Sequence, residues 1–136
     1  MTLTDHMLDH IAEIARRRGL KLVMLFGSVA AGSDRPDSDV DIAVRFGAAD
    51  MPFSRVLDIQ RDLSSLLDGR KVDLSVIDHA DPLFMKKIAE ACVILYEEPG
   101  EGRRFMLLSF KRYQDYKKYL AIERAYALDY VKRIAS

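Results

Sequence analysis

The chain has 136 residues and 49% of them are hydrophobic, so it can form one domain with a buried core but leaves little room for a second. Its 21 Lys and Arg residues balance 21 Asp and Glu residues, which argues against nucleic-acid binding through bulk positive charge and against disorder. No apolar run reaches the length of a membrane span or follows a basic N-terminal segment, so we expect a cytoplasmic globular domain without membrane contacts.

The N-terminal part of the chain predicts a helix, a strand and a short helical turn. Apolar residues at helical spacing predict an amphipathic helix over residues 4–18. A near-continuous apolar run predicts a central strand over residues 20–26. Gly27 ends that strand, and Ser28 is expected to cap a short turn of helix that Gly32 closes.

A second strand is predicted over residues 39–46, after a turn-forming segment at residues 33–38. Its side chains alternate between an apolar face and a face that carries two carboxylates: Val40, Ile42 and Val44 on the first, and Asp39, Asp41 and Ala43 on the second. A helix over residues 52–68 follows, and Gly69 is expected to be its C′ residue.

The third predicted strand, residues 71–77, alternates in the same way. Asp73 lies on its polar face, and three aliphatic side chains are expected to point inward: Val72, Leu74 and Val76. Asp81 and Pro82 form an N-cap and N1 pair that opens a third helix. A short strand over residues 92–96 is the fourth of the predicted sheet.

The last part of the chain predicts one long helix. Residues 99–102 are expected to form a hinge, and residues 103–136 contain neither glycine nor proline. Such a helix would be roughly 45 Å long, against a diameter of about 36 Å for a compact domain of this size, so it either covers one side fully or protrudes. Residues 101–136 hold nine basic and four acidic residues. We expect this tail to contact a second copy or a helical partner, unless the body covers it or it is simply a solvated helix.

Three of these elements carry residues suited to phosphate chemistry, in the pattern Gly-Ser-x10-Asp-x-Asp followed by a third carboxylate: Gly27, Ser28, Asp39, Asp41 and Asp73. A glycine lets the backbone approach a phosphate, and a serine hydroxyl can bind it. Two carboxylates at alternate positions of a strand share one face, and Mg²⁺ prefers such hard oxygen ligands. The pattern therefore predicts phosphoryl chemistry assisted by two Mg²⁺ ions.

The same residues lie in three segments that resemble the minimal nucleotidyltransferases of the DNA polymerase beta superfamily: LFGSVAAG at 25–32, SDVDIAV at 38–44 and KVDL at 71–74. The resemblance covers residues 4–98, so we expect a minimal nucleotidyltransferase domain over residues 1–98. It implies an α/β fold of the α+β type, a mixed sheet of about four strands flanked by helices. It also implies two Mg²⁺ ions and transfer of a nucleotidyl group. The implied site residues are Gly27 and Ser28 for the triphosphate, and Asp39, Asp41 and Asp73 for the metals and catalysis.

Within that family, the short domain and the helical tail resemble the antitoxins of HepT/MntA toxin–antitoxin pairs. This resemblance implies a HEPN-domain ribonuclease toxin as partner, with AMP transferred from ATP to a tyrosine of the toxin. Two other functions stay open. The chain could be a non-catalytic antitoxin, a binding module that acts through its C-terminal helix. It could also be an autonomous nucleotidyltransferase for a small hydroxylated molecule, with a homo-oligomer interface supplying the acceptor pocket.

Other interpretations of the charged residues near the motif are simpler. The two carboxylates of the second strand could be a solvated face. Asp73 could pair with Arg70 or Lys71. Ser28 could serve only as a helix cap. Arg35, in the loop before the carboxylates, could touch the triphosphate or be an ordinary surface arginine.

The remaining reactive side chains are interpreted as structural. His6 and His10 are four residues apart on a helix and are expected to be surface residues rather than metal ligands. His79 is expected in a loop, and Cys92, the only cysteine, is expected to be a buried, inert thiol. Five tyrosines of the tail are expected to be core and interface aromatics rather than a nucleic-acid stacking surface: Tyr113, Tyr116, Tyr119, Tyr126 and Tyr130.

Overall fold

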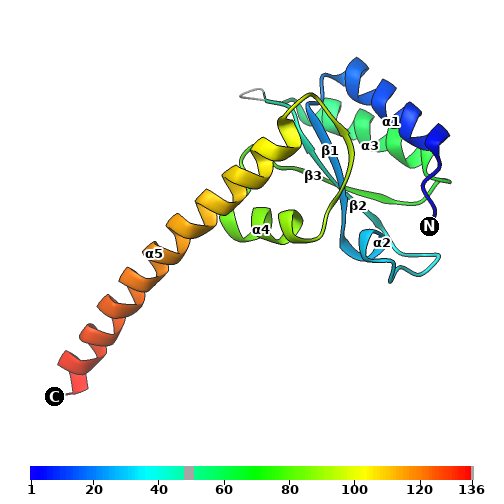
Figure 1. Cartoon of the computed structure of the whole chain (residues 1–136). Coiled ribbons are helices and arrows are strands. Elements are labelled where there is room, and N and C mark those ends of the chain that lie inside the picture. Colours follow the sequence, from blue (N-terminus) through cyan, green and yellow to red (C-terminus); the bar gives the residue numbers. More distant parts are fainter. Residues whose placement is uncertain (48–50, 136) are drawn as a thin grey trace.

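Helices and strands alternate along the chain in the computed structural model, which describes residues 1–47 and 51–135. The elements are α1 (Asp5–Arg18), β1 (Leu22–Phe26), α2 (Gly27–Ala31), β2 (Val40–Arg45), α3 (Phe53–Leu66), β3 (Val72–Val76), α4 (Pro82–Glu90), β4 (Val93–Glu97) and α5 (Glu101–Ala135). Every predicted element is present, with bounds within two residues of the predicted ones. The expected α/β fold of the α+β type is therefore confirmed (Figure 1).

The strands form one mixed sheet in the order β3-β2-β1-β4. β1 lies antiparallel to both β2 and β4, whereas β2 and β3 are parallel. The antiparallel register places Phe26 opposite Asp41, and the parallel register places Asp41 opposite Asp73. The end of β1 and the beginnings of β2 and β3 therefore meet at the same end of the sheet.

Helices cover both faces of the sheet. α1 and α3 lie together on one face, and α4 with the first turns of α5 lies on the other (Figure 1). All five residues of β1 are buried, and Ala43 is buried although it lies on the face of β2 that carries Asp41. Both faces of the central strands are apolar because each packs on a helical layer.

One detail of α3 and one of β3 differ from the predictions. α3 ends at Leu66 with Leu67 as its C-cap, so Gly69 is not the C′ residue, and Asp68 and Gly69 together make a left-handed turn. Val76 is 36% exposed instead of pointing into the core. β3 is an edge strand, and the strand order that makes it one is a non-local property.

α5 begins at Glu101, so it includes part of the segment 99–102 that was expected to be a hinge. Glu101 and Gly102 are buried, and Glu101 forms an ion pair with Arg45 at the end of β2. The expected last residue of the helix, Ser136, lies outside the described residues. No helix within residues 1–47 and 51–135 combines the length and apolarity needed to cross a membrane.

The C-terminal half of α5 protrudes from the body (Figure 1). Phe105 and Ser109 are buried against α4 and the sheet, but every residue from Lys117 to Ala135 is exposed. These exposed turns span roughly 28 Å at 1.5 Å per residue. The expected long helix is therefore confirmed, and of the two predicted arrangements it adopts the protruding one.

Candidate active site

Gly27 joins β1 to α2 in a backbone conformation that glycine adopts most readily. Its φ is +74°, in the left-handed region that side chains with a Cβ atom disfavour. A Cβ atom at this position would lie 2.9 Å from Asp41 Cγ and 3.2 Å from Asp41 Cβ, which is closer than van der Waals contact. The glycine therefore allows the Asp41 carboxylate to lie directly against the turn that follows β1.

Ser28 is the second residue of α2 and not its N-cap. The N-cap position belongs to Phe26, whose extended backbone leads into the helix, and Gly32 closes α2 with φ +73° as expected. Ser28 is half-buried, and its hydroxyl makes no hydrogen bond to any residue that the structure describes. The interpretation of Ser28 as a helix cap is therefore wrong, and its hydroxyl is available to a ligand.

Asp41 and Asp73 lie opposite each other on the parallel strands β2 and β3. Burial raises the pKa of Asp41 above its usual value, and the negative charges of Asp73 and then of Asp39 raise it further. Asp41 is half-buried, whereas Asp73 is exposed. These carboxylates therefore concentrate negative charge at one end of the sheet. This charge favours a cation as ligand.

The donor chemistry of these carboxylates fits Mg²⁺, which prefers hard oxygen ligands. Their arrangement is open, because no three His, Cys, Asp or Glu side chains converge into a metal-binding group within residues 1–47 and 51–135. Asp39 lies one residue before β2 and is 46% exposed, with its Oδ2 atom 3.9 Å from Lys71 Nζ. The structure therefore brings Asp41 and Asp73 together and leaves Asp39 at the margin of the site.

A lysine on α4 lies near the carboxylates and was not predicted from the sequence. Phe84 packs edge-to-face on Phe26 with ring centroids 5.8 Å apart, which places α4 on the same sheet face as Asp41. Lys87 follows Phe84 by three residues and so lies on the same side of the helix. Its positive charge offsets part of the rise in the pKa of Asp41. The helical spacing from Phe84 is the signal that could have identified Lys87.

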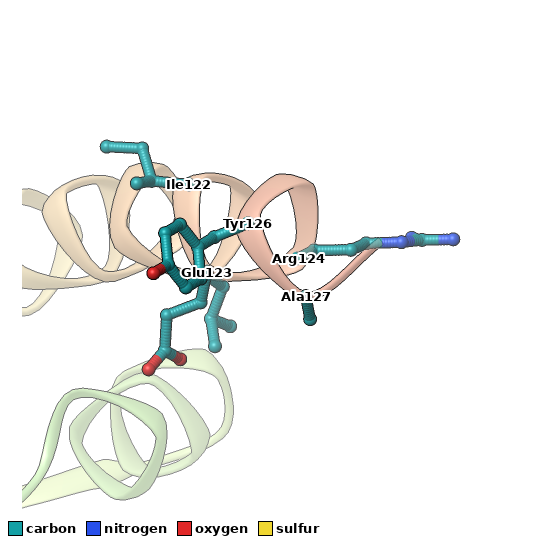
Figure 2. Close-up of a pocket in the computed structure, with 6 residues that line it drawn as sticks. Ile122, Glu123, Arg124, Tyr126 and Ala127 are labelled. Carbon is teal, nitrogen blue, oxygen red and sulfur yellow. The ribbon is translucent and has the colours of Figure 1, made fainter. Parts of the chain in front are cut away.

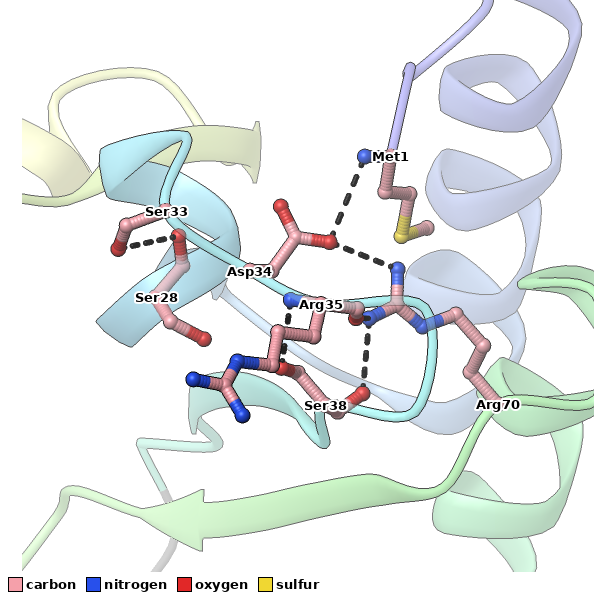
Figure 3. A network of polar contacts seen from close by, with 7 residues as sticks. All are labelled: Met1, Ser28, Ser33, Asp34, Arg35, Ser38 and Arg70. Carbon is pink, nitrogen blue, oxygen red and sulfur yellow. Dashed lines mark hydrogen bonds and ion pairs between the residues drawn. The ribbon is translucent and has the colours of Figure 1, made fainter.

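The loop between α2 and β2 is held by Arg70 (Figure 3). Its guanidinium donates to Asp34 Oδ2 at 3.0 Å and to the carbonyl oxygens of Arg35 and Ser38 at 2.9 and 2.8 Å. The hydrogen bond from Arg70 to the Asp34 carboxylate holds the pKa of Asp34 below its usual value. The side chain of Arg35 points away from the network and is exposed, as an ordinary surface arginine would be (Figure 3).

The ion pairs of this region exclude one of the simpler interpretations. Arg70 pairs with Asp34, and Lys71 pairs with Asp39. Among the described residues, none forms an ion pair with Asp73. The third carboxylate is therefore not a structural partner of either basic residue that precedes it.

The other candidate residues lie away from this site. His6 and His10 form a contact on the surface of α1, with their Nε2 atoms 3.2 Å apart, and His79 lies in an exposed turn. Cys92 precedes β4 and is half-buried, and burial raises its thiol pKa, so the thiol is poorly reactive. Among the tail tyrosines, Tyr113 and Tyr116 are half-buried. Tyr119, Tyr126 and Tyr130 are exposed, so the expected core role is wrong for these three.

Comparison with known proteins places this site in a family. A family model described as "Polymerase beta, Nucleotidyltransferase" matches residues 9–101, which include every residue of the candidate site. The chain belongs to the polymerase beta nucleotidyltransferase family. This nucleotidyltransferase is also 34% identical, over 96 residues, to a Methanocaldococcus jannaschii protein named as a protein adenylyltransferase. That match covers 64% of this chain and 95% of the relative.

Solved structures extend the similarity of the nucleotidyltransferase into α5. It matches a chain of a toxin–antitoxin crystal structure with AMP-PNP with a TM-score of 0.69 and 27% identity, over 92% of this chain and 98% of the other. It also matches a chain of the tri-AMPylated Shewanella oneidensis HEPN toxin in complex with MNT antitoxin, with a TM-score of 0.65 and 25% identity, over 96% and 99% of the two chains. The expected resemblance to minimal nucleotidyltransferases and to the HepT/MntA antitoxins is confirmed.

Proposed function

We propose that this nucleotidyltransferase transfers AMP from ATP to a tyrosine hydroxyl of a HEPN-domain toxin, with two Mg²⁺ ions, and thereby acts as the antitoxin of the pair. The observation that carries the proposal is the position of Asp41, packed on Gly27 and opposite Asp73. It places two carboxylates beside the turn that begins α2, where the Ser28 hydroxyl is free to bind phosphate. The names of the similar proteins support the acceptor class: a protein adenylyltransferase, and a HEPN toxin that is itself AMPylated.

Each residue of the site has its own task in this reaction. Gly27 and Ser28 bind the triphosphate through the backbone and the hydroxyl. Asp39, Asp41 and Asp73 would hold the Mg²⁺ ions, which when bound neutralise the charge of the phosphates and of the leaving pyrophosphate. Asp73 takes the proton of the acceptor hydroxyl as its oxygen bonds to the α-phosphorus, and the bond from that phosphorus to pyrophosphate breaks.

The exposed half of α5, residues 117–135, is the surface that we assign to the toxin. Its apolar side chains continue, at helical spacing, the face through which Phe105 and Ser109 pack on the body. The exposed members of this face and its flanks are Tyr119, Leu120, Tyr126, Tyr130, Val131 and Ile134. A run of large apolar side chains without a cover is typical of a protein interface.

One turn of this surface shows its mixed character. Ile122, Glu123 and Tyr126 project beside a shallow hollow, and Arg124 extends away from them (Figure 2). Aromatic and aliphatic side chains beside single charges suit a helical protein partner better than a polynucleotide, for which cations would dominate. A second copy of this chain is the other occupant, and sedimentation of the isolated protein distinguishes the two.

The experiment is to incubate the HEPN-domain toxin that we propose as partner with the protein, ATP and Mg²⁺, and to measure the intact mass of the toxin. We expect additions of AMP that map to tyrosine. The protruding α5 favours, as second candidate, an antitoxin that neutralises by contact alone, and this alternative predicts neutralisation without a change of mass. Transfer of AMP to a small hydroxylated molecule, with an unmodified toxin, would support the autonomous enzyme instead.

A further inference from the structure

Arg70 precedes β3 and lies outside the residues assigned to the reaction. Its side chain is only 14% exposed, and the hydrogen bonds of its guanidinium all reach the loop between α2 and β2 (Figure 3). They go to the carboxylate of Asp34 and to two backbone carbonyls of the loop. Its Nε atom is buried and has no partner in the part of the chain that the structure describes. The guanidinium therefore donates all of its hydrogen bonds to the loop, although this position leaves its buried Nε atom without an acceptor.

The part of the loop that Arg70 holds lies next to Asp39. The carbonyl of Ser38 accepts from Arg70 Nη2 at 2.8 Å, and Ser38 is fixed further by two hydrogen bonds with Arg35. Asp39 itself has a weaker tether, a 3.9 Å contact with the exposed Lys71. The position of Asp39 therefore depends on the backbone at Ser38, and so on Arg70.

The backbone of Arg70 is anchored where β3 begins. Ser64 Oγ donates to the carbonyl of Arg70 at 2.8 Å, and the N–H of Val40 donates to the carbonyl of Lys71 at 2.9 Å. This second bond joins the first residue of β2 to the residue that precedes β3. Asp73 is the second residue of β3, three residues after Arg70. One residue therefore connects the loop before Asp39 to the strand that carries Asp73.

We propose that Arg70 is a positioning residue for nucleotidyl transfer, which fixes Asp39 relative to Asp73. The inference rests on the roles proposed above for those two carboxylates. Without the guanidinium, the carbonyl of Ser38 loses its partner, and Asp39 keeps only the 3.9 Å contact with Lys71 and the hydrogen bond of the neighbouring Val40. A misplacement of about 1 Å in a catalytic constellation lowers a rate about 100-fold. A purely structural role would instead lower the stability and leave the rate of each folded molecule unchanged.

The test compares Arg70→Met and Arg70→Lys with a matched control, Arg18→Met. Arg18 also contacts a carboxylate twice, that of Asp62, at 3.1 and 3.0 Å, but it lies before the start of β1 rather than at its end. Two quantities are measured below the melting transition. One is kcat for AMP transfer, and the other is the calorimetric affinity for Mg²⁺ with an ATP analogue that cannot transfer its α-phosphate.

We expect Arg70→Met to lower kcat about 100-fold and to weaken binding of the ATP analogue together with Mg²⁺. Arg70→Lys keeps the charge but cannot reach three acceptors at once, so it should restore only part of both. Arg18→Met should lower the melting temperature and leave both quantities unchanged.

A further variant, Asp39→Asn, separates failure of this inference from failure of the proposed site. Wild-type kcat and affinity in the Arg70 variants, with transfer lost in Asp39→Asn, would overturn the positioning role alone. Full transfer by Asp39→Asn would overturn the site and the positioning role together. If Arg70→Met does not fold, Arg70→Lys decides, because it retains the ion pair with Asp34 and lacks the geometry to bind both carbonyls.

Discussion

The carboxylate of Asp41 fills the space that a side chain at Gly27 would need. Asp41 lies opposite Phe26 in the antiparallel register of β1 and β2, so the glycine that follows Phe26 turns the chain directly over the carboxylate. A Cβ atom there would lie 2.9 Å from Asp41 Cγ. Gly27, to which we assign phosphate binding, is thus also the residue that makes room for a carboxylate of the candidate site.

Gly27→Ala is expected to abolish AMP transfer by displacing Asp41. Its matched control is Gly19→Ala, because Gly19 has a nearly equal φ of +72° and a Cβ atom there would meet no described atom within 4 Å. Both variants lose about 1–2 kcal/mol from the left-handed backbone, measured by thermal unfolding. Only Gly27→Ala should also lose transfer. Equal transfer rates in the two variants would show that the reaction does not need Asp41 where it lies.

Ser28→Ala is expected to weaken ATP binding while leaving the fold almost unchanged. Ser28 does not cap α2, and its hydroxyl has no hydrogen bond to a described residue, so its removal costs the folded state little. Loss of a hydrogen bond to a charged phosphate costs about 1.5–3 kcal/mol of binding free energy. Calorimetric titration with ATP and Mg²⁺ measures this loss. An unchanged dissociation constant would remove Ser28 from the site.

The pH dependence of stability should reveal the ion pair between Asp34 and Arg70. The Arg70 guanidinium lowers the pKa of Asp34 below the ordinary value of 3.8, so this carboxylate stabilises the fold at pH values above 3.8. That stabilisation is lost as the pH falls below 3.8 and through the lowered pKa. Asp34→Asn should therefore reduce the melting temperature at neutral pH and differ little from the wild type in acid. A difference that stays constant with pH would mean that Asp34 acts by packing alone.

The sequence predicts most of the fold because its signals are local. Apolar spacing, the Asp81 N-cap and the glycines after β1 and α2 place each element within two residues of its bounds. The exposure of Val76 could not be predicted, because it depends on β3 lying at the edge of the sheet. The choice between a protruding and a covered α5 could not be made from the sequence, because an apolar stripe has the same spacing in a core and in an interface.

The sequence grouped the carboxylates of the candidate site with Gly27, but it did not indicate the residues that surround and hold them. Gly27, Asp41 and Asp73 come together through the pairing of three strands, which the Gly-Ser and Asp-x-Asp motifs indicate. Arg70 contacts Asp34 across 36 positions of the sequence, and no local pattern marks such a contact. The charge of Lys87 reaches Asp41 from α4, whose packing on the sheet is likewise non-local.

Removal of residues 117–135 tests the role of α5 more cleanly than removal of the whole helix. A cut after Gly102 would delete Phe105, which is 3% exposed and belongs to the core beneath α4 and α5. A chain that stops at Tyr116 loses, among the residues that the structure describes, only exposed turns of α5, so its melting temperature and ATP affinity should equal those of the full chain. Its complex with the toxin should be lost in size-exclusion chromatography. A truncated chain that still binds the toxin would place the interface on the body.

The most direct test of the central claim is the intact mass of the HEPN toxin. The toxin is incubated with ATP, Mg²⁺ and either the wild-type protein or the double variant Asp39→Asn/Asp41→Asn. The double variant should fold, because removal of two neighbouring negative charges relieves repulsion. We predict that the wild-type protein adds AMP to the toxin and that the folded double variant adds none. Modification of the toxin by the double variant at the wild-type rate would contradict the assignment of these carboxylates, and with it the proposed mechanism.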